Sequence, residues 1–172
     1  LFLNCYNYLS KKIRNLFFIV IPRHTERKDK IIEVFNTKKV LFNIRDSKKS
    51  KIKNNGPLIV CTFGELGLFF KLSEVAIVGG SFSENGGHNP IETNGFNCSV
   101  IFGPNMENFT DIRDTIIKQN AGFEVRNLDG LNKKLFTILK NKKLNIKVQR
   151  NFQNLCNTLS KTTKTQLDTL LK

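Results

Sequence analysis

The fold is decided by residues 75–92, VAIVGGSFSENGGHNPIE, which predict a buried strand, a glycine-rich loop and the start of a helix. The first four residues are all apolar, as in a strand that is covered on both faces. Two glycine pairs in the loop allow positive φ angles and the close approach of a ligand. Asn89 suits an N-cap and Pro90 suits the first helical position. Strand, loop and helix in this order form the basic unit of an α/β fold.

The rest of the chain repeats this alternation, with short apolar runs between amphipathic stretches. The predicted strands are Leu16–Ile21, Val40–Ile44, Pro57–Cys61, Val75–Val78, Ser99–Phe102 and Gly122–Val125. The predicted helices are the end of a helix over 1–14, then 26–35, 65–73, 89–95, 111–119, 129–140 and 147–171, the last with an apolar stripe of Phe152, Leu155, Leu159, Leu167 and Leu171. The pattern predicts a Rossmann-like parallel sheet with helices on both faces. We expect one domain over residues 1–172, ending in terminal helices over 147–172.

The chain is strongly basic, with a net charge of +14. Nucleic-acid binding is the first interpretation of such a charge, but lysine is spread along the chain and no nucleic-acid motif occurs. Two small clusters stand out, one at 11–14 and one at 48–53. Each is interpreted as a solvated surface or as a site of attraction to anionic lipid headgroups. We therefore expect no nucleic-acid partner.

Cysteine usage favours a reducing compartment. No two of Cys5, Cys61, Cys98 and Cys156 form a CxxC pair, so we expect free thiols. No His, Cys, Asp and Glu spacing predicts a metal site, and no apolar run reaches the roughly 18 residues of a membrane span. The sequence begins at Leu1 rather than at methionine, so we expect it to be the C-terminal part of a longer protein.

The loops that follow the strands are where a ligand is expected, because parallel sheets bind ligands at the carboxyl ends of their strands. Around Asn89, free N–H groups at a helix start would suit a phosphate. The alternative is a capping box in which Glu92 folds back onto the Asn89 amide and no ligand is needed. Glu84 lies eight residues before Glu92, a spacing seen in many GT-B glycosyltransferases, and is expected to be solvated.

Four segments together resemble the Kdo transferases (Kdo is 3-deoxy-D-manno-octulosonic acid). The segment from Val78 to Glu92, with its Gly-Gly-His-Asn-Pro run, resembles the donor-site signature of that family. Three weaker segments occur in the family's order: Pro22-Arg23-His24 with Glu26-Arg27, Phe63-Gly64-Glu65-Leu66, and Gly103-Pro104 with Asn108-Phe109. The resemblance covers roughly residues 10 to 140.

This resemblance implies the C-terminal, donor-binding half of a GT-B glycosyltransferase that transfers Kdo from CMP-Kdo to a lipid A precursor in lipopolysaccharide synthesis. It implies no cofactor beyond the donor substrate. The catalytic base, the acceptor site and the contact with the cytoplasmic face of the bacterial inner membrane are implied for an N-terminal domain absent from this chain. The isolated chain is therefore expected to bind CMP weakly and to transfer nothing.

The implied CMP contacts come from three loops, and a fourth group of residues is assigned to the phosphate or to the loop itself. The CMP contacts are Pro22, Arg23, Phe63, Gly64, Glu65, Asn89, Pro90, Ile91 and Glu92, and the loop residues are Gly86, Gly87 and His88. Arg23 would offer a fork of donors, and Glu92 would accept from the ribose hydroxyls. His88 could act as a general acid, contact the phosphate or anchor the loop, and an orienting or phosphate-contacting role is favoured over proton transfer.

Several alternatives stay open at this point. Arg23 could instead pair with Glu26 on the surface, and Phe63 could instead be a core residue. The whole chain could be the donor domain of another GT-B enzyme that uses a different nucleotide sugar. A basic RNA- or DNA-binding module ranks last, and it predicts a steep salt dependence of oligonucleotide binding.

Overall fold

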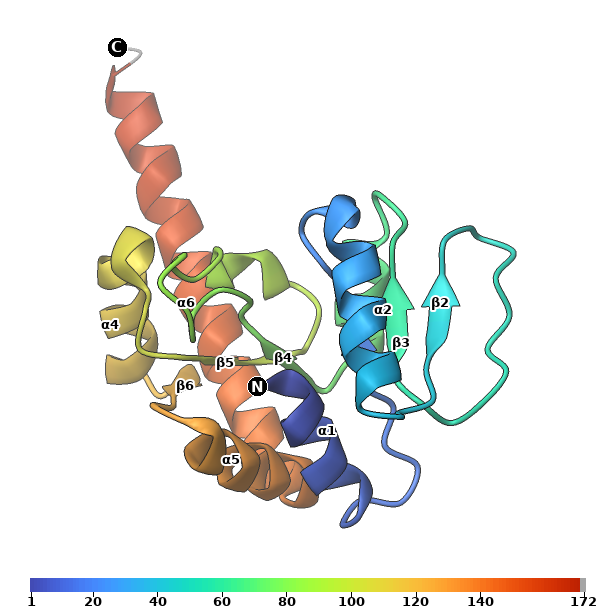
Figure 1. Cartoon of the computed structure of the whole chain (residues 1–172). Coiled ribbons are helices and arrows are strands. Elements are labelled where there is room, and N and C mark those ends of the chain that lie inside the picture. Colours follow the sequence, from blue (N-terminus) through green and yellow to red (C-terminus); the bar gives the residue numbers. More distant parts are fainter. Residues whose placement is uncertain (171–172) are drawn as a thin grey trace. The chain divides into compact units, whose positions relative to one another are not determined.

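The computed structural model describes residues 1–170, with side chains described for residues 1–161. Residues Leu167 and Leu171 of the predicted apolar stripe lie outside the described side chains. The chain divides into two compact units, Leu1–Phe69 and Phe70–Lys172, each with its own parallel sheet (Figure 1).

The first unit contains a three-stranded parallel sheet in the order β1-β3-β2. Its elements are α1 (Phe2–Ser10), β1 (Ile19–Val20), a 3-10 turn (Thr25–Arg27), α2 (Lys28–Thr37), β2 (Asn43–Arg45) and β3 (Leu58–Val60). The central strand β3 is fully buried and pairs in parallel with a strand on each side. Its residues Leu58 and Val60 pack with Phe69, Ile19 and Ile21 to form the core of this unit.

The second unit contains a three-stranded parallel sheet in the order β4-β5-β6. Its elements are α3 (Leu66–Leu72, which spans the unit boundary), β4 (Val75–Ile77), η2 (Pro90–Thr93), β5 (Ser99–Phe102), a 3-10 turn (Glu107–Phe109), α4 (Thr110–Lys118), β6 (Gly122–Glu124), α5 (Leu128–Lys140) and α6 (Lys142–Leu170). Helix α4 contacts β6, α5 contacts β4, and α6 contacts β5 and β6. Val100 and Phe102 of β5 pack against Ile116 of α4 and against Phe152 and Leu155 of α6.

The predicted alternation of strands and helices is confirmed, and every strand pair is parallel. The first strand is shorter than predicted, because Phe17 is half exposed and only Ile19 and Val20 pair in register with β3. The region predicted as terminal helices is one continuous helix, α6. The four cysteines are free, as expected, and burial raises the pKa of the Cys98 thiol to about 12.

Candidate functional site

The four resembling segments all lie at carboxyl ends of strands. In the first unit, Pro22 follows β1 and Phe63 follows β3, and these strands are adjacent, with Val20 opposite Ile59. In the second unit, the glycine-rich loop follows β4 and Gly103 follows β5, which are also adjacent. Each sheet therefore brings two of the segments to one edge, as the parallel topology predicts.

The loop after β3 presents an aromatic ring to solvent. The Phe63 side chain is 81% exposed, so the alternative of a core residue is wrong. Gly64 beside it has φ +75°, and an added Cβ there would meet no atom within 4 Å. An exposed ring can pack on the face of a planar base, and the uncovered backbone beside it can form hydrogen bonds with the edge of that base.

This exposed loop is held in place by Glu65. Its carboxylate accepts hydrogen bonds from Nε and Nη2 of Arg45 at 2.9 and 2.8 Å, and a further one from the Thr62 hydroxyl. Arg45 is the last residue of β2, so the fork ties the loop after β3 to the neighbouring strand. Both side chains are largely covered, with 20% of Arg45 and 11% of Glu65 exposed.

The hydrogen bonds from Arg45, and then from Thr62, lower the pKa of Glu65 to about 2. Glu65 is therefore ionised at neutral pH, and its carboxylate is already engaged within the protein. A nucleotide could therefore contact Glu65 only through the Glu65 main chain or through a carboxylate lone pair that Arg45 and Thr62 do not already use. Sequence reasoning missed Arg45, and the nearest signal was its position directly after the predicted strand Val40–Ile44.

The segment after β1 lies on the surface. Pro22 is half-buried and Arg23 is exposed. Glu26 lies beside His24, with 3.6 Å between Oε1 and Nδ1, in a pair whose side chains are 55% (His24) and 76% (Glu26) exposed. A contact this exposed contributes little to stability.

The glycine-rich loop in the second unit is braced from inside by Ser81. Its side chain is fully buried, and its hydroxyl donates to the Val78 carbonyl at 2.7 Å and accepts from the Gly103 amide at 2.8 Å. Gly80 has φ +79°, and an added Cβ there would fall on the Gly86 carbonyl oxygen, so the two halves of the loop touch. The loop is thus closed on itself and fixed to the strand end beside it.

Asn105 joins the same loop to the segment after β5. Its amide donates to the Ser81 carbonyl at 3.0 Å, its side chain donates to the Ser83 carbonyl at 2.9 Å, and its carbonyl accepts from the Gly87 amide at 2.7 Å. The His88 amide donates to the Gly79 carbonyl at 3.0 Å. The main chain of His88 therefore anchors the loop, whatever its ring contacts. Neither Ser81 nor Asn105 was assigned a role from sequence.

The helix predicted from Asn89 to Gly95 is instead a single 3-10 turn, Pro90–Thr93, which corrects that prediction. The side chain of Asn89 caps it by accepting from the Ile91 amide at 3.0 Å. Among the hydrogen bonds of the described residues, none runs from Glu92 back to the Asn89 amide, so the capping-box alternative is wrong. One short turn has a much smaller dipole than a helix, so a phosphate here would depend on individual N–H groups. Glu92 is exposed and Pro90 is buried.

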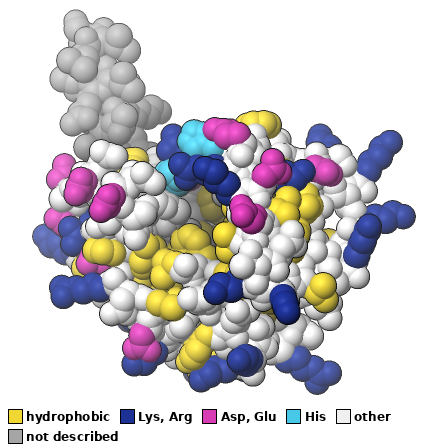
Figure 2. All heavy atoms as spheres, viewed as in Figure 1, with side chains coloured by type: hydrophobic (Ala, Val, Ile, Leu, Met, Phe, Trp, Pro, Cys, Tyr) yellow, Lys and Arg dark blue, Asp and Glu magenta, His cyan; other side chains and the backbone are white. Residues whose placement is uncertain are grey.

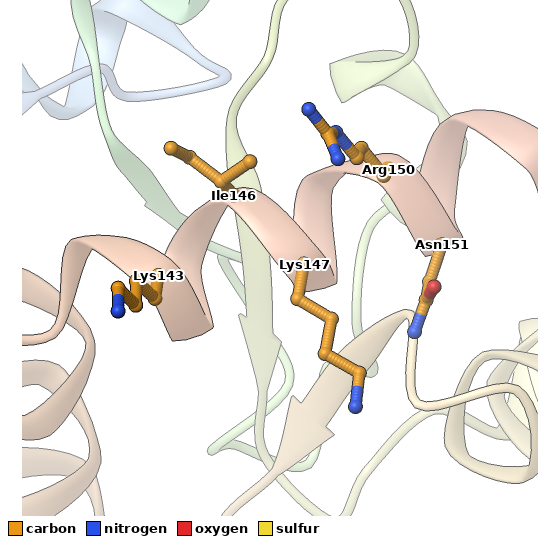
Figure 3. A pocket seen from close by; sticks show the side chains of 5 residues that line it. All are labelled: Lys143, Ile146, Lys147, Arg150 and Asn151. Atoms are coloured by element: carbon orange, nitrogen blue, oxygen red, sulfur yellow. The ribbon is translucent and has the colours of Figure 1, made fainter.

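A shallow hollow lies elsewhere, along α6. It is lined by Lys143, Ile146, Lys147, Arg150 and Asn151, none of which is a predicted site residue (Figure 3). The side chains described up to residue 161 include no group of three or more His, Cys, Asp or Glu placed to hold a metal ion. None of the helices in the described part of the chain combines the length and apolar character needed to span a bilayer.

Comparison with known proteins gives several curated relatives. No family model matches the chain. It is 35% identical over 145 residues to 3-deoxy-D-manno-octulosonic acid transferase from Rickettsia prowazekii, covering 84% of this chain and 31% of that protein. It is 33% identical over 147 residues to the enzyme of the same name from Aquifex aeolicus, covering 86% of this chain and 40% of that protein. The chain therefore spans about a third of the length of the curated relatives it matches.

One solved structure matches most of the fold. It is the C-terminal CMP-Kdo binding domain of WaaA from Acinetobacter baumannii, with a TM-score of 0.77 and 28% identity, covering 88% of this chain and 81% of that one. The parallel sheets and helices of this chain thus match the Rossmann-like C-terminal domain of a GT-B enzyme. This fold and the curated relatives together show that the chain belongs to the family of 3-deoxy-D-manno-octulosonic acid transferases.

Proposed function

We propose that this chain is the donor-binding part of a glycosyltransferase that moves Kdo from CMP-Kdo to a lipid A precursor at the cytoplasmic face of the inner membrane. The combined sequence and fold match to a CMP-Kdo binding domain carries this proposal. The exposed, clamped loop after β3 and the braced glycine-rich loop after β4 support it. Such loops pre-organise a binding surface, so less ordering entropy is lost when a ligand binds.

Within this proposal, Phe63 packs on the cytosine and the Gly64 main chain bonds to its edge. Arg23 supplies a planar fork of donors to the phosphate or to the base carbonyl. Glu65 acts through the loop that it fixes, because Arg45 already binds its carboxylate.

We also assign CMP contacts to the turn at Asn89. The phosphate, whose negative charge grows as the glycosidic bond breaks, lies beside Pro90 and Ile91. Because Pro90 has no N–H group and the Ile91 N–H group already donates to the Asn89 side chain, the contact depends on other N–H groups of the turn. Glu92 is exposed and accepts from the ribose hydroxyls. Gly86 and Gly87 keep the loop narrow beside the phosphate, and His88 orients the phosphate.

The reaction itself needs a base and an acceptor site that we place in another part of the protein. The present chain then binds the donor, fixes its orientation and stabilises the departing CMP. We propose no cofactor beyond the donor substrate. A Kdo-transfer assay on this chain alone should give no product, and turnover would show that the catalytic groups lie within it.

Calorimetric titration with CMP, UDP and GDP tests the donor assignment. We expect CMP to bind more tightly than the other two, and we expect Glu92→Ala to weaken CMP binding by about tenfold to a hundredfold, the value of losing hydrogen bonds to a charged group. Glu84→Ala is the matched control, because Glu84 is also exposed and lies in the glycine-rich loop just before the turn that holds Glu92. Phe63→Ala should weaken CMP binding without changing stability. Equal affinities for the three nucleotides, or equal effects of the two glutamate variants, would overturn the assignment.

A further inference from the structure

Residues 46–56, in the connection between β2 and β3, form a basic loop that the proposed donor site does not use (Figure 1). Four of its residues are lysines with exposed side chains, at positions 48, 49, 51 and 53. Ile52, between two of them, is 56% exposed. In the same view, Lys and Arg side chains project at the right-hand edge of the molecule, where Figure 1 draws this connection (Figure 2). The loop thus offers positive charge and an apolar side chain together.

The base of the basic loop is fixed by a buried amide. Asn43 is only 5% exposed, and its side-chain amide donates to the carbonyls of Asn54 and Gly56 at 3.0 and 3.2 Å. Its oxygen accepts from the Lys53 amide at 2.7 Å. Asn54 in turn donates to the Phe42 carbonyl at 3.2 Å. The two ends of the loop are therefore clasped by hydrogen bonds that do not depend on any ligand.

The outer part of the loop is fixed by Ser50. Its hydroxyl accepts from the amides of Asp46 and Ser47 at 3.3 and 3.1 Å and donates to the Asp46 carboxylate at 2.9 Å. Asp46 is the one acidic residue of the loop, and this bond turns it towards the loop's own backbone. The lysines are thus displayed on an ordered frame, with no ion pair to a loop carboxylate among the described residues.

A second exposed apolar side chain lies beside the base of this frame. Leu41 is 74% exposed, and its carbonyl packs directly against Gly56, where an added Cβ would clash with it. Clustered lysines flanked by exposed aliphatic side chains are the pattern of segments that bind at a membrane interface. There the cations attract anionic headgroups and the apolar groups enter the boundary of the acyl chains.

We propose that residues 46–56 form a contact with an anionic lipid surface, in which the lysines face headgroup phosphates and Ile52 enters the interface. The choice of lipid over nucleic acid rests on the proposed function, because a lipid acceptor requires the protein to work at a membrane. An oligonucleotide would share the phosphate chemistry but gives Ile52 no apolar partner.

Binding to vesicles tests this proposal. The chain is mixed with vesicles of phosphatidylcholine alone and of phosphatidylcholine with phosphatidylglycerol, and the bound fraction is measured by co-sedimentation. The loop variant replaces Lys49, Lys51 and Lys53 by glutamine, and leaves Lys48 intact because its charge helps to lower the pKa of Glu65. The matched control replaces Lys143, Lys147 and Arg150 by glutamine, which removes the same charge from the α6 hollow.

We expect the anionic vesicles to be preferred, and the loop variant to bind them about a hundredfold more weakly, at about fivefold per lysine. The α6 variant should stay within a few-fold of the unchanged chain. Ile52→Asn should weaken binding several-fold even at high salt, where the charge attraction is screened. Because all four replaced loop residues are exposed, we expect the variants to stay folded, and circular dichroism checks this.

Three results would overturn the proposal: equal loss of vesicle binding in the two triple variants, equal binding to neutral and anionic vesicles, or no effect of Ile52→Asn on vesicle binding. A parallel CMP titration separates this outcome from the donor assignment. Loss of vesicle binding with unchanged CMP affinity is the expected result for the loop variant. Failure of CMP preference alone would remove the donor assignment and leave the vesicle result standing.

Discussion

The strongest test of the braced loop is Ser81→Ala. The substitution removes one hydroxyl and leaves the backbone and volume of the loop nearly unchanged. In the native structure this hydroxyl is the acceptor for the Gly103 amide at 2.8 Å and the donor to the Val78 carbonyl at 2.7 Å. Ser81, with 0% of its surface exposed, lies where bulk water does not replace the lost partner.

The cost follows from the two backbone groups that lose their partner. A buried polar group left without a hydrogen bond costs about 1–3 kcal/mol. With two such groups, Ser81→Ala should lower the free energy of unfolding by about 2–6 kcal/mol, a large share of the total stability of a small domain. The loop should also lose its fixed shape, so the affinity for CMP should fall together with stability.

Ser83→Ala is the matched control for this experiment. Its hydroxyl also donates to a carbonyl three residues earlier, that of Gly80 at 3.0 Å, but the side chain is exposed. Water satisfies the Gly80 carbonyl once the hydroxyl is gone, so the change should stay within about 0.5 kcal/mol. Urea unfolding of both variants gives the comparison. If Ser81→Ala also stays within about 0.5 kcal/mol, or matches Ser83→Ala, the brace does not hold the loop as argued.

Two further predictions concern the other loop and the glycines. The pKa of Glu65 is lowered from 4.5 to about 2, so its stabilising effect is complete above pH 4.5 and is lost as the pH falls towards 2. In urea unfolding, the stability gap between the unchanged chain and Glu65→Gln should therefore narrow over that range, and a gap that stays constant with pH would contradict the Arg45 clamp. Gly80→Ala and Gly95→Ala both place alanine at positive φ, at a cost of about 1–2 kcal/mol, but only the first would clash with the Gly86 carbonyl. Gly80→Ala should therefore lower the melting temperature more than Gly95→Ala does. Equal decreases would show that the glycine-rich loop can shift to accommodate the added Cβ.

The sequence predicts the order of elements well, because each strand is a short apolar run that packs within a core. Residues Ser99–Phe102 were predicted as a strand and form β5, in which all four residues are buried. The boundaries were less certain where one residue of a run faces solvent, as Phe17 does before β1. The turn at Asn89 was predicted as a helix because an Asn cap followed by proline suits both an α-helix and a short 3-10 turn. Which of the two forms depends on how many further turns the following residues can build.

The residues that fix the candidate site were harder to predict, because their partners are distant in sequence. Arg45 lies 20 residues before Glu65 and Ser81 lies 22 before Gly103, and neither spacing has a periodicity that indicates contact. Their pairing depends on which strands become neighbours. β2 beside β3 brings Arg45 opposite Val60, five residues before Glu65, and β4 beside β5 brings the two loops of the second unit together.

Both units therefore position their loops in the same way. In each, the loop after one strand is tied to the residue that ends, or directly follows, the adjacent parallel strand: Glu65 to Arg45, and Ser81 to Gly103. Because strand register sets where each anchor lies, the shape of a loop depends on side chains packed in the sheet below it. A core substitution that shifts β5 would move the Gly103 amide and, through Ser81, the glycine-rich loop. The candidate site is thus specified by packing as well as by its motif residues, which is why a motif alone predicts what the loops bind but not what holds them.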